Sequence, residues 1–566
     1  MQSRPIAAHS RGILISLSRR LQQLQKGFQT LGIEPFTVMD SSERYCYEPT
    51  LHWNPQVEEY FVKAYGAEHF RSISKALTRP SCYSCIRVNI LKTTSDAVIE
   101  KLLAMQHGAD GRSIDKDLIH KCPIPGLDYV VFVRGSGPHK IEYNYAPQQP
   151  FKEVIVSRKC AESVLRGAQV YVPGVLACSG HVEKGDRVAV SVAIEQPQPD
   201  GKWSTGITRG IVLRGSETDP QYIQRMGLYI GQGTTMLSRA GIFRALEGVA
   251  VSMSNTVFDL PSFNNVLEGE IFLQNLPSIV AAHALDPQRG ERVLDMCAAP
   301  GGKTTAIAML MRDEGEVVAA DRSHNKVIDV QNLADEMGLK SIVTYKLDAL
   351  KSVAKNIIDS TEDISTSKSS IVEEKLNNDI SHGNGQIPID TCNSKTKQRT
   401  KNGPGKNHFN GGRVEKSKGF APNSFDRVLL DAPCSALGLR PRLFAGEETL
   451  ESLRNHGKYQ RRMFDQAVQL VRPGGVLVYS TCTINPGENE AVVRYALDTY
   501  KFLSLAPQHP KVGGSGLLGR CDLSDGYVEE WLRPGEEELV QRFDPSSSDT
   551  IGFFIAKFNV GCKDTS

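Results

Sequence analysis

Apolar positions in the C-terminal half of the chain follow two spacings in turn. Segments such as ERVLDMCA and GEVVAADRS are short runs of β-branched and apolar residues, typical of buried strands. Segments such as KVIDVQNLADEMG repeat apolar residues at the spacing of an amphipathic helix. Because strands and helices alternate, we expect an α/β fold over residues 256–560: a doubly wound, mostly parallel, Rossmann-like sheet.

The preceding segments show two other patterns. Residues 150–255 contain short β-branched runs, such as EVIVS and DRVAVSVAI, separated by Gly, Pro, Asp and Asn. This alternation predicts a compact β-barrel embedded in the chain. Residues 47–149 combine a helical VEEYFVKAYGAEHF with an extended SCIRVNI, which predicts a small N-terminal α/β unit.

A polar insert interrupts the α/β pattern at residues 351–420. It is rich in Ser, Asn, Lys, Asp and Gly and has few aromatic residues. Such a segment buries too little apolar surface to offset the entropy of ordering, so we expect it to be disordered. Its basic part, 395–418, is expected to be a solvated loop, and contact with RNA is the alternative.

Residues 1–46 are expected to form a flexible extension. Residues 1–33 contain several Arg and Lys but no Asp or Glu, a composition found in organelle transit peptides. The alternative is an extension without a role in the fold, because a charged, aromatic stretch typical of folded protein follows Met39. The expected compartment is the cytoplasm, or an organelle if residues 1–38 are a transit peptide; the nucleus stays open.

Composition adds little about partners but something about chemistry. A net charge of +2 creates no global field that would imply nucleic acid or membrane, so any basic patch must be local. No apolar run is long enough to span a bilayer, and we expect no membrane partner and a monomer. The 12 cysteines are scattered, which favours a reduced compartment where free thiols are available for catalysis. The single C-x-x-C, Cys82 and Cys85, has no second pair at zinc-site spacing, and no metal is expected.

The segment VLDMCAAPGGKTT ends in Gly-Lys-Thr, as a phosphate-binding loop does. A Walker loop requires glycine at the position that Cys297 occupies, so that backbone amides can surround the phosphates. Pro300 has no amide hydrogen to offer an anion. A nucleoside triphosphate site is therefore disfavoured.

Acidic residues follow the first three predicted strands. Asp295 and the glycine-containing loop come after the first strand, Asp321 after the second and Asp348 after the third. Ligands of such sheets bind beyond the carboxyl ends of the strands. Asp321 is placed to bind two ribose hydroxyls and Asp348 to accept from the amine of adenine. A nucleoside without phosphates, S-adenosylmethionine, fits this arrangement, and the G-x-G-x-x-G of NAD sites is absent.

Cysteines follow the next two strands, in DAPCSALG and YSTCTINPGENE. Inert core residues are one interpretation of Cys434 and Cys482, because Cys is often buried. The other is methylation of a pyrimidine ring carbon. Carbon 5 of cytosine is a poor nucleophile until a thiolate adds at carbon 6 and converts the ring into an enamine. Two thiols beside an adenosine site suit that reaction.

With these residues in place, the sequence resembles the Nop/Sun family of RNA cytosine-5 methyltransferases. VLDMCAAPGGKT, LLDAPCS and VYSTCTINPGENE match the family's motifs in order, and NLPSIVAAHALDPQRGE resembles its lead-in. The barrel segment VLRGAQVYVPG resembles the PUA domain of the family's sixth-member branch. The resemblance implies methylation of a cytosine near the 3′ end of tRNA acceptor stems, or of similar motifs in mRNA. The N-terminal extension and the insert have no counterpart in it.

The resemblance also implies roles for individual residues. Cys482 would be the nucleophile and Cys434 would help release the product, whereas Asp431 would bind the pairing edge of cytosine, with Lys303 nearby. Residues implied in binding S-adenosylmethionine are Cys297, Ala298, Ala299, Pro300, Gly301, Gly302, Lys303, Asp321, Asp348 and Asp431. Residues implied in contacting RNA are Arg166, Gly167 and Tyr171. One alternative function is an RNA-binding or assembly factor regulated by the cofactor, in which methylation is secondary. The other is a DNA or protein methyltransferase, which the PUA-like barrel disfavours.

Overall fold

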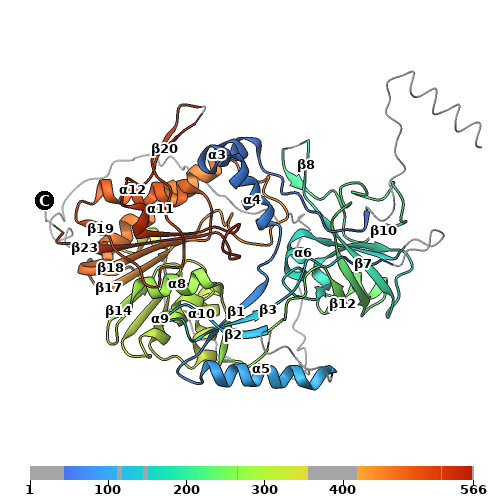
Figure 1. The fold of residues 1–566 in the computed structure, drawn as a ribbon, viewed down its shortest axis with the longest axis horizontal. Coiled ribbons are helices and arrows are strands. Elements are labelled where there is room, and N and C mark those ends of the chain that lie inside the picture. The colour runs from blue at the N-terminus through green and yellow to red at the C-terminus, as the bar shows by residue number, and fades with distance from the viewer. Residues whose placement is uncertain are drawn as a thin grey trace, which may run out of the picture.

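The computed structural model describes residues 44–110, 118–143, 151–199, 201–263, 265–354, 417–523 and 525–563. In Figure 1 a large α/β domain lies on the left, a β-barrel on the right, and a small sheet with one helix below and between them. The predictions for residues 1–43 and for most of the insert fall outside the described residues.

The α/β domain is built on one sheet with the strand order β16-β15-β14-β17-β18-β23-β19, and β22 pairs with β23. Strands β16 to β18 run parallel and β23 is antiparallel to β18. The expected Rossmann-like fold class is confirmed. The strands are β14 (Arg292–Asp295), β15 (Glu316–Asp321), β16 (Ile342–Lys346), β17 (Phe425–Asp431), β18 (Val471–Thr481), β19 (Leu503–Leu505), β22 (Val540–Phe543) and β23 (Phe553–Val560), and the hairpin β20 (Arg520–Asp522) and β21 (Val528–Glu530) lies outside the sheet.

Helices cover both faces of this sheet and bury its apolar residues (Figure 1). On one face Ile279 and Ile307 pack with Val293. On the other, Phe464 and Val492 pack with residues such as Leu430. Two hydrophobic layers therefore fix the strand ends in space. The helices are α8 (Leu276–Leu285), α9 (Gly302–Leu310), α10 (His324–Met337), α11 (Leu450–Leu470) and α12 (Glu490–Thr499).

The two ends of the insert lie side by side. Val353 forms a β-bridge with Phe420, and the Ala354 amide donates to the Phe420 carbonyl at 2.9 Å. The first and last few residues of the segment 351–420, expected to be disordered, thus belong to the fold.

The small sheet has the order β13-β1-β3-β2 and is antiparallel throughout. Its edge strand β13 comes after the barrel in the chain, so the unit is not closed by residues 47–149 alone. Helices α3 and α4 pack instead on the α/β domain, where Phe61 and Phe70 join Leu453 and Ile484 in one cluster. The elements are α3 (Pro55–Tyr65), α4 (Ala67–Leu77), β1 (Tyr83–Val88), α5 (Ser95–Asp110), β2 (Ile119–Lys121), β3 (Val130–Arg134) and β13 (Ile271–Leu273).

The barrel has the strand order β10-β6-β4-β7-β11-β12-β5 around a core of valines such as Val154, Val175 and Val190. The alternation of β-branched residues and turns therefore predicted this part correctly. Its elements are β4 (Glu153–Ser157), α6 (Arg158–Val164), β5 (Val170–Tyr171), β6 (Val175–Ser179), β7 (Arg187–Ala193), β10 (Ile211–Leu213), β11 (Tyr229–Thr235), α7 (Arg239–Arg244) and β12 (Val249–Thr256), with a hairpin of β8 (Gln196–Pro197) and β9 (Trp203–Ser204). Of the helices described, none has both the length and the apolar character needed to cross a bilayer.

Candidate active site

The carboxyl ends of five adjacent strands place the predicted site residues along one edge of the sheet. Because β16, β15, β14, β17 and β18 are neighbours and parallel, the residues at or just after their ends follow the same order. From one side to the other, these are Asp348, Asp321, Asp295, Asp431 and Cys482. Carboxylates therefore follow four of these five strands, and the Cys482 thiol follows the fifth.

The Asp295 carboxylate binds both ends of the loop between β14 and α9 by hydrogen bonds. This carboxylate is 1% exposed and accepts from the Thr304 hydroxyl at 2.8 Å and from the Cys297 amide at 3.4 Å. Burial raises the pKa of Asp295 to about 7. Gly301, the N-cap of α9, has a φ of +107°, a conformation that side chains rarely adopt. Asp295 therefore shapes the loop that is predicted to bind the cofactor.

Asp321 and Asp348 each keep one carboxylate oxygen available. An oxygen of Asp321 accepts from the Ser323 amide, and one of Asp348 from the Leu350 amide, both at 3.1 Å. The second oxygen of each accepts no hydrogen bond from the described residues. Both residues are half-buried, and free acceptors at two neighbouring strand ends fit the hydroxyls and amine of a nucleoside.

Lys303 and Asp431 form an ion pair, with Lys303 Nζ 2.7 Å from Asp431 Oδ2. Burial disfavours the charge on Lys303, but the charge of Asp431 and the hydrogen bond to it raise the lysine's pKa. The other oxygen of Asp431 accepts from Ser480 at 2.7 Å, and the ring centroid of Phe553 lies 5.2 Å from Lys303 Nζ. Ser480 and Phe553 were not identified from the sequence, although Ser480 stands two residues before Cys482.

The sulfur atoms of Cys434 and Cys482 are 3.4 Å apart. The hydrogen bond from Cys434 lowers the pKa of Cys482, with Lys303 also favouring the thiolate, whereas burial and Asp431 oppose it. The same hydrogen bond and burial raise the pKa of Cys434 well above its usual range. The pair therefore loses its first proton at a lower pH than an ordinary thiol would, and the resulting charge lies on Cys482. By contrast, burial raises the pKa of Cys297 well above its ordinary value, which leaves that thiol neutral.

Glu488 joins the two loops that carry the thiols. It is fully buried and accepts from the Ser435 amide at 3.0 Å, beside Cys434, and from the Asn485 side chain at 3.0 Å, just after Cys482. The Gln460 amide on α11 donates to it at 2.7 Å. Glu488 was not identified from the sequence. The available signal was an acidic residue a few positions after the end of a predicted strand.

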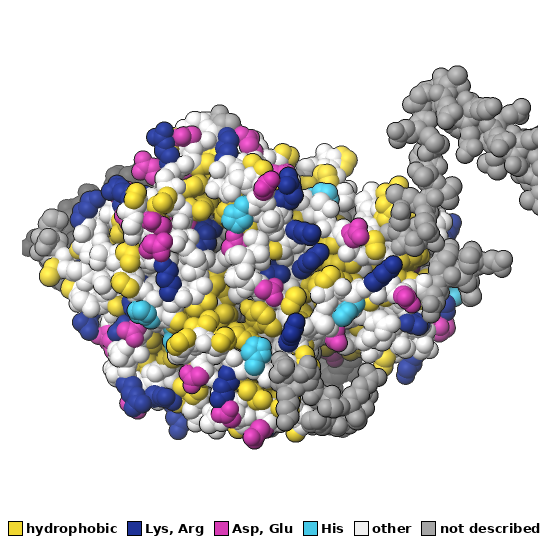
Figure 2. All heavy atoms as spheres, viewed as in Figure 1, with side chains coloured by type: hydrophobic (Ala, Val, Ile, Leu, Met, Phe, Trp, Pro, Cys, Tyr) yellow, Lys and Arg dark blue, Asp and Glu magenta, His cyan; other side chains and the backbone are white. Residues whose placement is uncertain are grey.

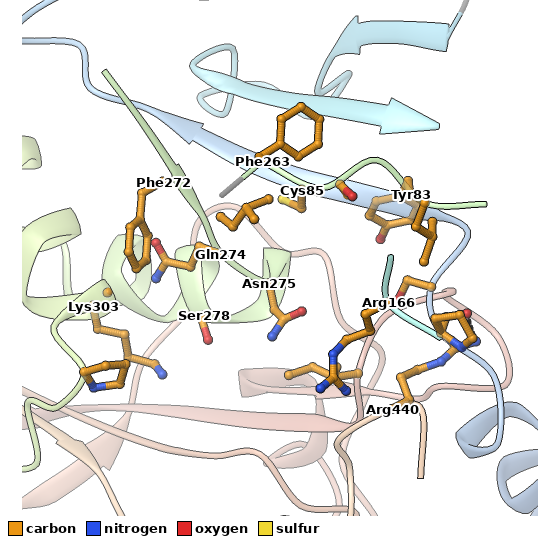
Figure 3. Close-up of a pocket in the computed structure, with 18 of the residues that line it drawn as sticks. Tyr83, Cys85, Arg166, Phe263, Phe272, Gln274, Asn275, Ser278, Lys303 and Arg440 are labelled. Carbon is orange, nitrogen blue, oxygen red and sulfur yellow. Dashed lines mark hydrogen bonds between the residues drawn. The ribbon is translucent and has the colours of Figure 1, made fainter. Parts of the chain in front are cut away.

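A cavity of about 550 Å³ joins the α/β domain, the small sheet and the barrel. At one end it is lined by Lys303, Asp431 and the loop residues Cys297 to Pro300 with Gly302; at the other by Arg166 and Arg440. Figure 3 shows Gln274, Asn275 and Ser278 between these ends. The cavity's lining does not include Asp321, Asp348 or either thiol.

The structure places Arg166 and Gly167, two of the three residues implied in RNA contact, at adjoining cavities and the third, Tyr171, at neither. Arg166 lines the first cavity. Gly167 lines a second cavity of about 690 Å³, which shares Ala168, Leu260 and Ser262 with the first. A Cβ at Gly167 would lie 2.2 Å from the Leu260 carbonyl oxygen, so only glycine fits this close approach. Tyr171 is 49% exposed and lines neither cavity.

Basic side chains accompany these cavities. His139, Lys140 and Arg187 line the second cavity. Figure 2 shows Lys and Arg side chains near the middle of the face, between the α/β domain and the barrel. Within the described residues, no group of three or more His, Cys, Asp or Glu side chains is arranged to hold a metal ion.

The chain matches two family models and several complete relatives. The model of the 16S rRNA methyltransferase RsmB/F matches residues 282–362 and 408–559, and that of the PUA domain matches 152–193. The chain is 65% identical to the rRNA (cytosine-C(5))-methyltransferase NOP2C of Arabidopsis thaliana, over 92% of this chain and 93% of that protein. It is 34% identical to the human tRNA (cytosine(72)-C(5))-methyltransferase NSUN6, over 91% of this chain and 99% of that protein. The structure of NSun6 from Pyrococcus horikoshii with SFG superposes with a TM-score of 0.62 at 26% identity, covering 90% of this chain and 99% of that one.

Proposed function

The chain belongs to the family of RNA cytosine-5 methyltransferases, and we propose that its target is a cytosine near the 3′ end of a tRNA acceptor stem. The enzyme takes its methyl group from S-adenosylmethionine, its substrate is RNA, and its barrel is a PUA domain. The particular RNA and the roles of individual residues are our proposals.

In the proposed reaction, the Cys482 thiolate adds to carbon 6 of cytosine. When bound, S-adenosylmethionine supplies an electrophilic methyl group. Asp431 accepts from the exocyclic amine of the base and is itself held by Lys303 and Ser480. Addition of sulfur makes carbon 5 nucleophilic, so that it takes the methyl group and then carries one proton too many.

Cys434 is proposed to remove that proton. While Cys482 is a thiolate, its hydrogen bond with Cys434 is the largest cause that raises the pKa of Cys434. Once Cys482 is bonded to carbon 6 it carries no charge, and this cause disappears. Burial still opposes ionisation, but the pKa of Cys434 falls, so that it can lose its own proton to solvent. The Cys434 thiolate then accepts the proton from carbon 5, and the carbon–sulfur bond breaks with its electrons returning to Cys482.

The observation that carries the tRNA proposal is the cavity that the barrel shares with Lys303 and Asp431. A volume of about 550 Å³, with Arg166 at one end and Lys303 at the other, has room for only a nucleotide or two. In RNA bound by Arg166, the target base would therefore lie within a nucleotide or two of the nucleotide that Arg166 contacts. A base near a free 3′ end meets this requirement without bending of a long duplex, and two tRNA (cytosine(72)-C(5)) relatives match over nearly their whole length.

Ribosomal RNA is the second candidate, because the relative at 65% identity is an rRNA (cytosine-C(5))-methyltransferase. A terminal or looped cytosine in rRNA, or in a similar motif of mRNA, would enter the cavity by the same contacts. The site chemistry does not distinguish these substrates, because the pairing edge of cytosine is the same in each.

Bisulfite sequencing of tRNA, rRNA and mRNA from cells with and without the protein tests the target. We expect one acceptor-end cytosine of tRNA to lose methylation in the deletion and regain it with wild type, but not with Cys482→Ala. Loss confined to rRNA would overturn the tRNA proposal. Full complementation of growth by Cys482→Ala would favour an RNA-binding role instead. We also propose a cytoplasmic monomer, to be checked by cell fractionation and light scattering.

A further inference from the structure

Arg87, on β1 of the small sheet, is a fully buried cation without an acidic partner. Its exposure is 0%, and among the described residues no carboxylate forms an ion pair with it. Its Nη2 donates to the Thr305 hydroxyl at 2.7 Å in the first turn of α9, and its Nε donates to Gln274 Oε1 at 2.8 Å. A charge buried this deeply is costly and must be matched by well-made hydrogen bonds.

The bond from Arg87 fixes the orientation of the Gln274 amide. A guanidinium has donors but no acceptor, so only the oxygen of the amide can face it. The amide nitrogen, Nε2, must therefore point the other way. An ordinary glutamine can exchange the two ends of its amide, but this one cannot without placing two donors in contact.

Gln274 lines the substrate cavity, and its Nε2 has no hydrogen-bond partner among the described residues. Gln274 is 9% exposed, Nε2 is buried without a hydrogen bond, and the residue lines the cavity with Lys303. A Cβ built on Gly302 would lie 3.5 Å from this nitrogen, which places it against the cofactor loop. Figure 3 shows Gln274 beside Phe272, between Lys303 and Asn275. A buried amide N–H without an acceptor costs stability unless a ligand accepts its hydrogen bond.

We propose that Gln274 is a binding residue of the active site, whose Nε2 donates to an oxygen of a bound ligand, and that Arg87 positions it. The shared chemistry is an oxygen acceptor with no hydrogen of its own to offer. Two sources can supply it: the carboxylate of the methyl donor, or a phosphate or base carbonyl oxygen of the RNA. The inference deepens the proposed function and rests on it.

Two substitutions separate binding from packing. Gln274→Glu keeps the shape and the bond to Arg87 but replaces the donor by a carboxylate oxygen. Gln274→Met keeps the length and removes the donor without adding charge. Gln56→Glu, in the exposed first turn of α3, is the matched control for the added charge. Melting temperatures of all variants report whether the fold is kept.

The measurements are the Kd of S-adenosylmethionine by calorimetry on the full chain and the Kd of target RNA by filter binding. We expect one of the two affinities to fall roughly tenfold or more in Gln274→Met, with the other unchanged, and further in Gln274→Glu. If only the affinity for S-adenosylmethionine falls, its carboxylate is the acceptor. If only the affinity for RNA falls, the acceptor is an RNA oxygen. Both affinities within twofold of wild type in Gln274→Met would overturn the inference.

The role of Arg87 is tested by a double-mutant cycle. Arg87→Lys removes the Nε donor, so we expect it to weaken the same affinity as Gln274→Met, and the double variant to be no weaker than Gln274→Met alone. Additive losses would contradict positioning through Gln274. The Kd of S-adenosylmethionine is measured without RNA, and methylation of tRNA by the wild type is measured separately. Failure of the proposed target can therefore be distinguished from failure of this inference.

Discussion

Replacement of Cys434 by alanine should suppress the reactivity of Cys482 before any RNA is bound. The two sulfur atoms are 3.4 Å apart, and the hydrogen bond between them is the main cause that lowers the pKa of Cys482. A hydrogen bond to a charged group contributes about 1.5–3 kcal/mol. Its loss would reduce the thiolate population at neutral pH roughly ten- to hundredfold, while Lys303 still favours the thiolate.

The assay is alkylation of the free enzyme by iodoacetamide at pH 7, followed by mass spectrometry of the peptide that contains Cys482. Cys434→Ser is the control, because a hydroxyl can still donate to the thiolate. We expect Cys482 to react roughly ten- to hundredfold more slowly in Cys434→Ala and close to the wild-type rate in Cys434→Ser. An unchanged or faster reaction in the alanine variant would refute the account of the thiol pair.

The same variants are predicted to differ from wild type during turnover. Both lack a thiol that can accept the proton from carbon 5, so a protein–RNA adduct should accumulate on a denaturing gel. Cys434→Ala should form it more slowly than Cys434→Ser, because its nucleophile is less ionised. If only free protein is seen for both variants with wild-type substrate and donor, Cys434 does not act in release.

Four further outcomes are expected. Asp431→Asn should lower kcat about a hundredfold or more, since it removes the acceptor for the base and the partner of Lys303; single-turnover methylation measures it. Asp348→Ala should raise the Kd of S-adenosylmethionine roughly tenfold or more without changing RNA affinity, read by calorimetry. Arg166→Ala should weaken RNA binding and reduce its salt slope by about one, measured by filter binding. For Asp295, the folded pKa of about 7 exceeds the unfolded value of about 3.9, so its stabilisation is complete below about pH 4 and lost as pH rises through about 7; Asp295→Asn should flatten this decline in melting temperature.

The parts of the site that sequence predicted are those set by local pattern. A parallel strand ends where its apolar run ends, so residues at those ends, such as Asp321 and Cys482, fall on one edge whatever the loops do. The glycine-containing loop and the barrel likewise follow from short-range spacing. These features require only the fold class and the order of strands.

The remaining features depend on contacts between distant segments. The edge strand β13 pairs with β1, although the whole barrel segment separates them in the sequence. Arg87, in the small sheet, donates to Thr305 in helix α9 of the α/β domain. Glu488 ties two loops by bonds that run through Ser435 and Asn485. No periodicity along one chain encodes such pairings, because each partner alone is an ordinary polar residue. They therefore become visible only in the structure.

The central claim is that Cys482 forms the bond to cytosine, and a trapped complex tests it most directly. RNA with 5-fluorocytosine at the target position would be methylated but could not be released, since carbon 5 then carries no proton to remove. Proteolysis and mass spectrometry of that complex should find the methylated fluoropyrimidine attached to the peptide that contains Cys482. Attachment to Cys434, or no attachment under conditions where ordinary RNA is methylated, would contradict the account.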